Sequence, residues 1–322
     1  MSFPPFTWHD GERIVRFGRD ALDGARELIG GPYALLTTPR AAAVAPALAA
    51  GAREVHLVPQ GPVDEVSAGL RGAVRSSTVV ALGGGRVIDV AKAIAAADPP
   101  RRLAAVPTTL SAAEMTRSHR VPAGVAPDTP RVRPALVLND PALSASQPEP
   151  ALAASAANAL GHAVEAPLTP AANPVATLAA GRAAELIVGG FDRPEPDREA
   201  LALGALLAGY AMCSTGYGLH HVVSQTLARV AGVGHGPANA AMLPHSVAAL
   251  AGRVADPAGL AALAPAASRL AARAGAARLR DLGVERGAIG ALAAAAAARP
   301  ELGHTPPPAS EDELRRLYEA AW

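Results

Sequence analysis

The chain has 322 residues, which is longer than a single hydrophobic core usually requires, so two domains are expected. Its 29 basic and 28 acidic residues leave a net charge of +1, which excludes the basic surface that holds a nucleic-acid backbone. Half of the residues are hydrophobic but only 3% are aromatic, so the core is expected to consist mainly of Ala, Leu and Val.

Nothing in the sequence predicts export or a membrane span. The first ten residues lack a basic region followed by an apolar run, so we predict no signal peptide. Apolar stretches are interrupted by Pro and Arg before they reach the length of a span. The single cysteine, Cys213, excludes an internal disulfide and fits a reducing compartment. We therefore expect a cytoplasmic protein that binds neither membrane nor nucleic acid.

The first half of the chain alternates short apolar runs with helix-type segments. The pattern predicts strands over residues 13–18, 33–38, 54–59, 78–82 and 103–107, and helices over residues 40–50, 63–74 and 87–97. Near-continuous apolar strands that alternate with helices are typical of a doubly wound parallel sheet. This predicts an α/β nucleotide-binding domain over residues 1–149.

The strand signals end at about residue 152. Long Ala- and Leu-rich segments, broken by Pro and Gly, then predict an all-α domain over residues 150–322. The boundary is placed in residues 140–150, a turn-rich segment with three prolines. A cleft between two such domains is where a site is expected.

A Gly-Gly-Gly-Arg segment at residues 83–86 follows a predicted strand and opens a helix. Glycines let the backbone approach a diphosphate, and a helix start offers free N–H groups. The alternative is a tight turn without a ligand, because the segment is not the G-x-G-x-x-G fingerprint. The following helix contains Lys92, the only lysine of the chain, for which a plain surface role is left open.

Hydroxyl side chains follow the predicted strand at 103–107, where a nucleotide or its nicotinamide would lie, although they could also be helix caps. At the end of the strand over residues 33–38 there is no acidic residue to hold ribose hydroxyls. Arg40 stands nearby and can accept a 2′-phosphate, which slightly favours NADPH over NADH, unless this Arg is simply solvated. The expected cofactor-binding residues are Thr38, Arg40, Gly83, Gly84, Gly85, Arg86, Asp89, Thr108, Thr109, Ser111 and Thr116.

Four residues of the helical half are candidate metal ligands. Asn158 and His162 are four residues apart and share a helix face, while His221 and His235 lie in a second segment. Three imidazoles and an amide could surround one divalent ion. The alternative is that all four are ordinary interior polar residues on Ala-rich helices.

Several segments resemble the iron-containing alcohol dehydrogenase family, specifically its maleylacetate reductase branch: residues 83–92, 107–116, 138–143, 158–166, 218–221, 234–245 and 276–283. The resemblance implies a dehydroquinate synthase-like fold, an NAD(P)-binding first domain, a metal site in the second and a homodimer. Asn158 stands where metal-dependent members carry Asp. Since an amide does not compensate the charge of a dication, we expect Zn or Fe to be weakly held or absent. Arg86 and Gln225 stand where the family usually has Ser and His.

The leading hypothesis is an NAD(P)-dependent oxidoreductase that moves hydride between nicotinamide and a small oxo or hydroxy acid. Its expected proton donors and charge-stabilising groups are His162, His220 and His221. Arg117 and Arg120 could hold a substrate carboxylate or belong to the surface. Two alternatives stay open. One is a tailoring dehydrogenase that oxidises a secondary alcohol of a metabolite or peptide, such as a β-hydroxy acid that then loses carbon dioxide. The other is a non-catalytic binding partner.

Overall fold

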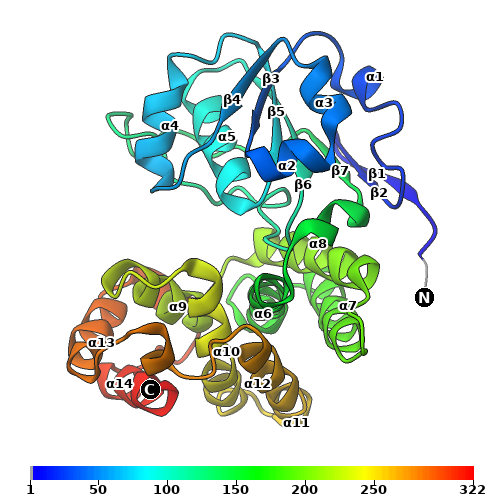
Figure 1. The fold of residues 1–322 in the computed structure, drawn as a ribbon. Helices are drawn as coiled ribbons and strands as arrows, with labels where there is room; N and C mark the ends of the chain where they lie inside the picture. Colours follow the sequence, from blue (N-terminus) through cyan, green and yellow to red (C-terminus); the bar gives the residue numbers. More distant parts are fainter. Residues whose placement is uncertain (1–2) are drawn as a thin grey trace. The chain divides into compact units, whose positions relative to one another are not determined.

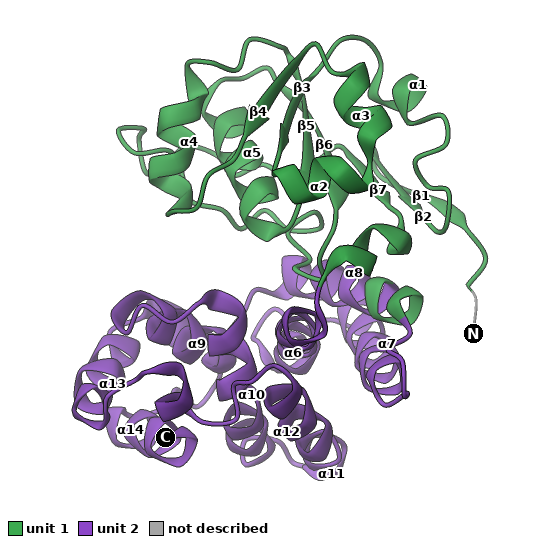
Figure 2. Cartoon of the chain, viewed as in Figure 1, with its two compact units in different colours: residues 1–147, 198–202 green, residues 148–197, 203–322 purple. Residues whose placement is uncertain are grey.

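The computed structural model describes residues 3–322, which fold into two compact units (Figures 1 and 2). The first extends to Gln147 and also includes residues 198–202, and the second contains residues 148–197 and 203–322. The sequence places the boundary at residues 149/150 and does not indicate the return of residues 198–202. Arg198 explains that return, because its guanidinium donates to the carbonyl oxygens of Ser144 and Gln147.

The first unit is built on a seven-stranded sheet in the order β1-β2-β7-β6-β5-β3-β4. All neighbours are parallel except β1 and β2, which form an antiparallel hairpin at one edge. The predicted α/β fold with a doubly wound sheet is therefore confirmed. The strands are β1 Phe6–Asp10, β2 Arg13–Phe17, β3 Ala34–Thr37, β4 Glu54–Leu57, β5 Thr78–Gly83, β6 Arg102–Pro107 and β7 Leu136–Asn139.

Helices cover both faces of this sheet. Alternate strand residues point to opposite faces, so Leu36 and Val79 belong to one core with α4 and α5, whereas Leu35 and Val80 belong to another with α1, α2 and α3. The helix predicted over residues 40–50 is divided at Ala45, because Pro46 supplies no N–H to continue it. The bounds are α1 Ala25–Ile29, α2 Pro39–Val44, α3 Pro46–Gly51, α4 Val63–Arg71, α5 Gly85–Ala97 and η1 Pro141–Ser146.

The second unit is entirely helical within the residues described, as the sequence predicts. Helix α6 is buried on nearly all sides from Leu152 to Glu165, and α7, α9, α10 and α12 pack against it. The bounds are α6 Glu149–Glu165, η2 Ala166–Leu168, α7 Pro174–Phe191, α8 Arg198–Thr215, α9 Leu219–Val230, α10 His235–Ala251, α11 Ala258–Ala261, α12 Ala264–Arg273, η3 Leu279–Leu282, η4 Arg286–Ala288, α13 Ile289–Ala297, η5 Pro300–His304 and α14 Glu311–Ala321.

Across residues 3–322, no single helix combines the length and the apolar character needed to cross a membrane. The sharply bent pair Arg198–Thr215 and Leu219–Val230 meets the criterion only when the two helices are taken together.

Candidate functional site

The strand order places a switch point between β3 and β5. The chain leaves β3 for β4 on one side, and β5, β6 and β7 then follow on the other side. Ligands of open α/β sheets bind outside the carboxyl ends of the strands at such a point. The segment after β3 begins with Thr38, whose hydroxyl accepts the N–H of Ala41 and caps α2. The segment after β5 is the glycine-rich turn, so the structure brings both predicted nucleotide segments to one edge of the sheet.

The start of α5 at this edge has no side-chain cap. Its first N–H groups, together with the helix dipole, therefore form an anion-binding position of the kind that takes a diphosphate. Two glycines let the loop after β6 pack closely against this turn, because a Cβ at Gly84 would lie 3.1 Å from Thr109 Cγ2 and one at Gly85 would lie 2.9 Å from Ser111 Cβ. The hydroxyl of Thr108 is buried without a hydrogen-bond partner at the same edge. These residues fit a dinucleotide.

The hydroxyl residues after β6 do not lie at the start of a helix, in contrast to one of the two alternatives. Residues 108–111 belong to a loop, so their hydroxyls do not cap a helix, and that alternative is wrong. Ser111 Oγ accepts the N–H of Ala113 within the loop. Arg86 is held by Gln60, since its Nη1 donates to Gln60 Oε1. Arg40 is exposed and reaches the carbonyl oxygen of Ser146 at 3.5 Å.

Lys92 is fully buried, so the possibility of a surface role is wrong. Its ammonium group donates to the carbonyl oxygens of Ala113 and Ser118 at 3.0 and 2.8 Å and lies 2.7 Å from Asp89 Oδ1. It also contacts Thr116, so Asp89 and Thr116 are both held by this one side chain. Lys92 thereby anchors the loop that follows β6.

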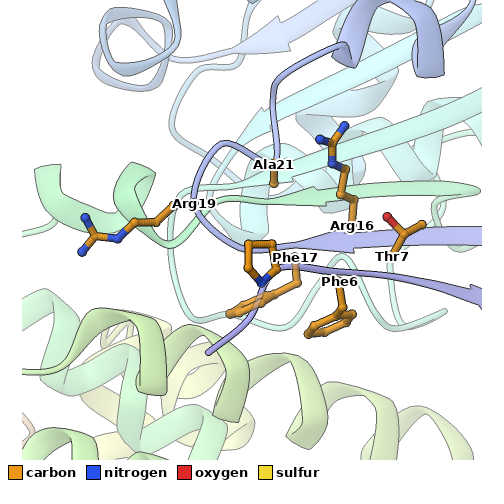
Figure 3. A pocket seen from close by; sticks show the side chains of 7 residues that line it. Phe6, Thr7, Arg16, Phe17, Arg19 and Ala21 are labelled. Carbon is orange, nitrogen blue, oxygen red and sulfur yellow. The ribbon is translucent and has the colours of Figure 1, made fainter. Parts of the chain in front are cut away.

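The expected substrate-binding arginines lie farther along this loop. Arg117 is exposed, and Arg120 is paired with Asp64 at 3.0 Å on the surface. A hollow elsewhere in this unit lies beside β1 and β2, where the rings of Phe6 and Phe17 stack at 5.3 Å. Figure 3 shows that the side chains of Arg16 and Arg19 point in different directions there. Its polar groups do not converge, so it is not a candidate site.

In the second unit, three of the predicted histidines lie together. His162 comes from α6, and His220 and His221 come from the first turn of α9. The rings of His162 and His221 stack with their centroids 4.4 Å apart, and the ring of His220 meets that of His221 edge-on at 5.0 Å. All three are buried, and burial lowers the pKa of each, to about 3 for His220 and His221.

A residue that the sequence reasoning missed organises this cluster. Glu165, at the end of α6, accepts the N–H groups of His220 and His221 through Oε1, so it caps the start of α9. Its Oε2 lies 2.5 Å from Nδ1 of His221. Burial raises the pKa of Glu165 and lowers that of His221, so the two share protons as one unit. The available signal was its spacing: Glu165 follows His162 by three residues on one helix face.

His220 occupies a different environment from His221. Ser246 Oγ donates to the carbonyl oxygen of Met242 and lies 3.2 Å from Nδ1 of His220. A Cβ at Gly161 would lie 2.5 Å from Nε2 of His220, so that edge of the ring faces the backbone of α6. Nε2 of His220 and Nε2 of His221 are both buried with no hydrogen-bond partner in the described chain, but only that of His220 is packed against the backbone of α6. His221 is therefore the better placed of the two to act on a ligand.

The remaining predicted ligands do not complete a metal site. His235 is exposed at the start of α10, and its Nε2 lies 3.2 Å from the amide nitrogen of Asn239, while Asn158 is buried on α6. Stacked rings only 12° from parallel cannot both direct in-plane lone pairs at one nearby ion. No group of three or more His, Cys, Asp or Glu side chains in residues 3–322 is arranged to hold a metal. The donors, as arranged, do not fit a resident ion.

Loss of nucleotide binding is expected on changing Gly84 to Val. The β-branched side chain would collide with Thr109 and fill the space over the start of α5. Isothermal titration with NADH and NADPH measures the effect, and circular dichroism verifies that the variant is folded. Gly69→Ala is the control, because a Cβ at that glycine of α4 meets nothing within 4 Å. A folded Gly84→Val variant with unchanged affinity would remove this turn from the binding site.

The structure thus combines a doubly wound α/β unit, which has an uncapped helix start at its switch point, with a helical unit that contains a buried histidine cluster. The family model for the C-terminal part of Fe-containing alcohol dehydrogenases matches residues 152–322, and the iron-containing alcohol dehydrogenase model matches residues 37–145. The chain therefore belongs to the iron-containing alcohol dehydrogenase family.

The relatives agree with this assignment. Maleylacetate reductase 1 of Rhodococcus opacus is 34% identical over 55% of this chain and 52% of its own length, and maleylacetate reductase of Rhizobium sp. is 32% identical over 69% and 64%. The matched part thus spans about half of the first of these relatives. Among solved structures, maleylacetate reductase from Rhizobium sp. strain MTP-10005 has a TM-score of 0.83 at 30% identity, covering 99% of this chain and 98% of its own. The predicted fold and family resemblance are confirmed.

Proposed function

We propose that the protein is an NAD(P)-dependent oxidoreductase that reduces the carbonyl group of a small oxo acid, with maleylacetate as the candidate substrate. The observation that carries the proposal is the uncapped start of α5 at the switch point of the sheet. The substrate class is supported by relatives that are named maleylacetate reductase.

The first unit would hold the cofactor. The N–H groups at the start of α5 would bind the diphosphate, and the Thr108 hydroxyl is a buried polar group available to the nucleotide. NAD(P)H supplies the hydride when bound. Lys92 keeps the loop after β6 in place, since it ties Ala113, Thr116 and Ser118 to α5.

The second unit would donate or accept the proton of the reaction. The alkoxide formed by hydride addition needs a proton, which the doubly protonated Glu165–His221 pair would give up through Nε2 of His221, the ring nitrogen that has no partner in the described chain. Glu165, bonded to Nδ1, stabilises the charged ring and keeps its orientation. After transfer from Nε2, one proton remains between Nδ1 and the carboxylate. In the oxidising direction the same Nε2 accepts the proton.

The test combines binding and turnover. Titration with NADH and NADPH should show binding of at least one, and oxidation of that cofactor should depend on maleylacetate. Absence of binding of both at millimolar concentration would contradict the proposal and leave the binding-partner hypothesis. Cofactor binding with turnover of hydroxy acids or peptide alcohols, but not of maleylacetate, would favour the tailoring dehydrogenase. A cytoplasmic location and a homodimer stay predictions.

Arg40→Ala is expected to weaken NADPH binding about ten- to hundredfold and to leave NADH binding nearly unchanged. A 2′-phosphate would lose one charge-assisted contact, worth roughly 1.5–3 kcal/mol. Paired titrations with the two cofactors measure the ratio. Arg53→Ala is the control, because it removes the same charge at the amino end of β4, away from the nucleotide edge. Equal losses for both cofactors would assign Arg40 to the solvated surface.

Asn158→Asp is expected to raise metal affinity over the weak binding that we predict for the natural chain, provided that the stacked rings of His162 and His221 turn so that both can ligate one ion. The carboxylate would add one compensating negative charge beside buried neutral imidazoles. Elemental analysis of both proteins, purified without chelator, measures the iron and zinc content. If the natural protein holds stoichiometric metal and loses activity on chelation, the argument from the amide is wrong.

A further inference from the structure

One arginine forms hydrogen bonds to two residues that lie on either side of His221 in the sequence. Arg299, which precedes η5, donates through Nη2 to the hydroxyl of Tyr217 at 3.2 Å and to Oε1 of Gln225 at 3.1 Å. Tyr217 and Gln225 lie four residues before and four residues after His221. The ring of Tyr217 also contacts that of His221, with centroids 5.8 Å apart. Arg299 therefore spans both sides of the histidine that the proposed reaction uses.

The guanidinium is itself held firmly. Glu301 accepts from Nε and Nη2 of Arg299, each at 3.0 Å, and also from the hydroxyl of Tyr217 at 2.9 Å. The side chain of Arg299 is only 13% exposed. Hydrogen bonds from Arg299 hold the pKa of Glu301 at about 2, so this carboxylate is ionised at neutral pH. A paired, planar guanidinium is a rigid support for whatever it contacts.

This contact determines which end of the Gln225 amide faces the arginine. A guanidinium has only donors, so the amide must present its oxygen to Arg299. The NH2 group then points away from the guanidinium, on the face of α9 that Gln225 shares with His221 because the two are one turn apart. The arginine thus converts an amide that could accept or donate into a donor beside His221.

We propose that Gln225, oriented by Arg299, binds an acceptor oxygen of the substrate through its amide NH2 group. That oxygen belongs to a carboxylate or to the carbonyl under reduction, since both only accept hydrogen bonds. Arg299 is a positioning residue, because it acts through Gln225. The inference rests on the proposed function for the identity of the reaction, whereas the donor role of Gln225 follows from its contact with Arg299.

The main variant is Gln225→Glu, which keeps the size of the side chain and its contact with Arg299 but replaces the donor by an acceptor. We expect kcat/KM for maleylacetate to fall about ten- to hundredfold with unchanged affinity for NADH. A rise of KM for maleylacetate but not for its dimethyl ester identifies a carboxylate. A fall of kcat for both compounds identifies the reacting carbonyl oxygen. Val230→Glu is the control, because it adds the same charge at an exposed position of α9.

A second pair of variants tests the positioning role. Arg299→Met should lower kcat/KM less than Gln225→Glu does, since the freed amide can still turn toward the substrate, and Arg299→Lys should restore part of the loss because it retains a donor for Oε1. Unchanged constants in Gln225→Glu, or an equal loss in Val230→Glu, would overturn the inference.

The inference can be tested even if the natural protein does not reduce maleylacetate. That result would defeat the proposed function, and calorimetric titration of the NADH-saturated protein with maleate would then decide. At least tenfold weaker binding of maleate by Gln225→Glu supports the donor role. Equal binding by the two proteins, or none by the natural protein, refutes it.

Discussion

Glu165→Gln is expected to lower kcat by about 10²–10⁴ in both reaction directions, the range over which general acid–base catalysis contributes. Oε2 of Glu165 lies 2.5 Å from Nδ1 of His221, so an ionised Glu165 accepts the Nδ1 proton and leaves Nε2 as the proton acceptor of the ring. A glutamine can donate to Nδ1, and the proton of the neutral ring would then move to Nε2. That tautomer cannot accept a proton from an alcohol, and in the reducing direction no carboxylate stabilises the charged ring. Steady-state kinetics in each direction measures the loss.

The control must separate this effect from helix capping, because Glu165 also accepts N–H groups of α9. Thr305→Val serves that purpose. The hydroxyl of Thr305 accepts the N–H of Leu219 at 2.9 Å at the same helix start but does not contact the ring of His221. The Thr305→Val variant should lose about 1 kcal/mol of folding stability and keep kcat within a few-fold of the natural value. An equal loss of kcat in both variants would show that Glu165 acts only as a cap.

Glu114→Gln is expected to remove a stability loss of about 3 kcal/mol that the natural protein undergoes between pH 4.5 and pH 7. Glu114 is buried, its Oε2 has no hydrogen-bond partner, and burial raises its pKa to about 7. The folded protein therefore retains a proton that the unfolded chain releases. A raised pKa gives stability that is fully present below pH 4.5 and is lost as the pH rises through about 7.

Chemical denaturation at pH 5 and pH 8 measures this directly. At each pH, the unfolding free energy of the natural protein is subtracted from that of Glu114→Gln. This difference should be about 3 kcal/mol larger at pH 8 than at pH 5. Glu319→Gln is the control, since Glu319 is exposed on α14. A difference that is the same at both pH values would mean that Glu114 is already ionised in the folded state.

Much of the fold could be predicted because the relevant signals are local. Near-continuous apolar runs located β2 to β6, and the loss of those runs after residue 152 predicted the helical unit. Two strands were missed for identifiable reasons. β7 is a four-residue run that lies between Pro134 and Pro141, in a segment that resembles a loop, and β1 is only partly buried and pairs as an antiparallel edge. The position of β7 is specified by its pairing with β2 and β6 more than by its own sequence pattern.

The candidate site was predictable only in part. The glycine-rich turn and the histidines were visible as residue types at fixed spacing, but their surroundings were not. The position of Lys92 in the sequence leaves a surface role open, yet the side chain is buried because three carbonyl oxygens and Asp89 replace its hydration. Glu165 was overlooked because a carboxylate near the end of an Ala-rich helix is ordinary until its partners are known.

The sequence by itself determined the kinds of elements, their order, the parallel sheet and the family, since periodicity, breakers and motif spacing are properties of neighbouring residues. Only the tertiary structure decided which buried polar groups meet. The partners in the histidine cluster are far apart in the chain: Glu165 and His221 are 56 residues apart, and Gln225 and Arg299 are 74 apart. A buried polar group needs a hydrogen-bond partner but can take it from any segment that packing brings close. Packing thus places Nε2 of His220, but not that of His221, against the backbone of α6. It also brings Arg299 to the amide oxygen of Gln225, which leaves the NH2 group as a donor.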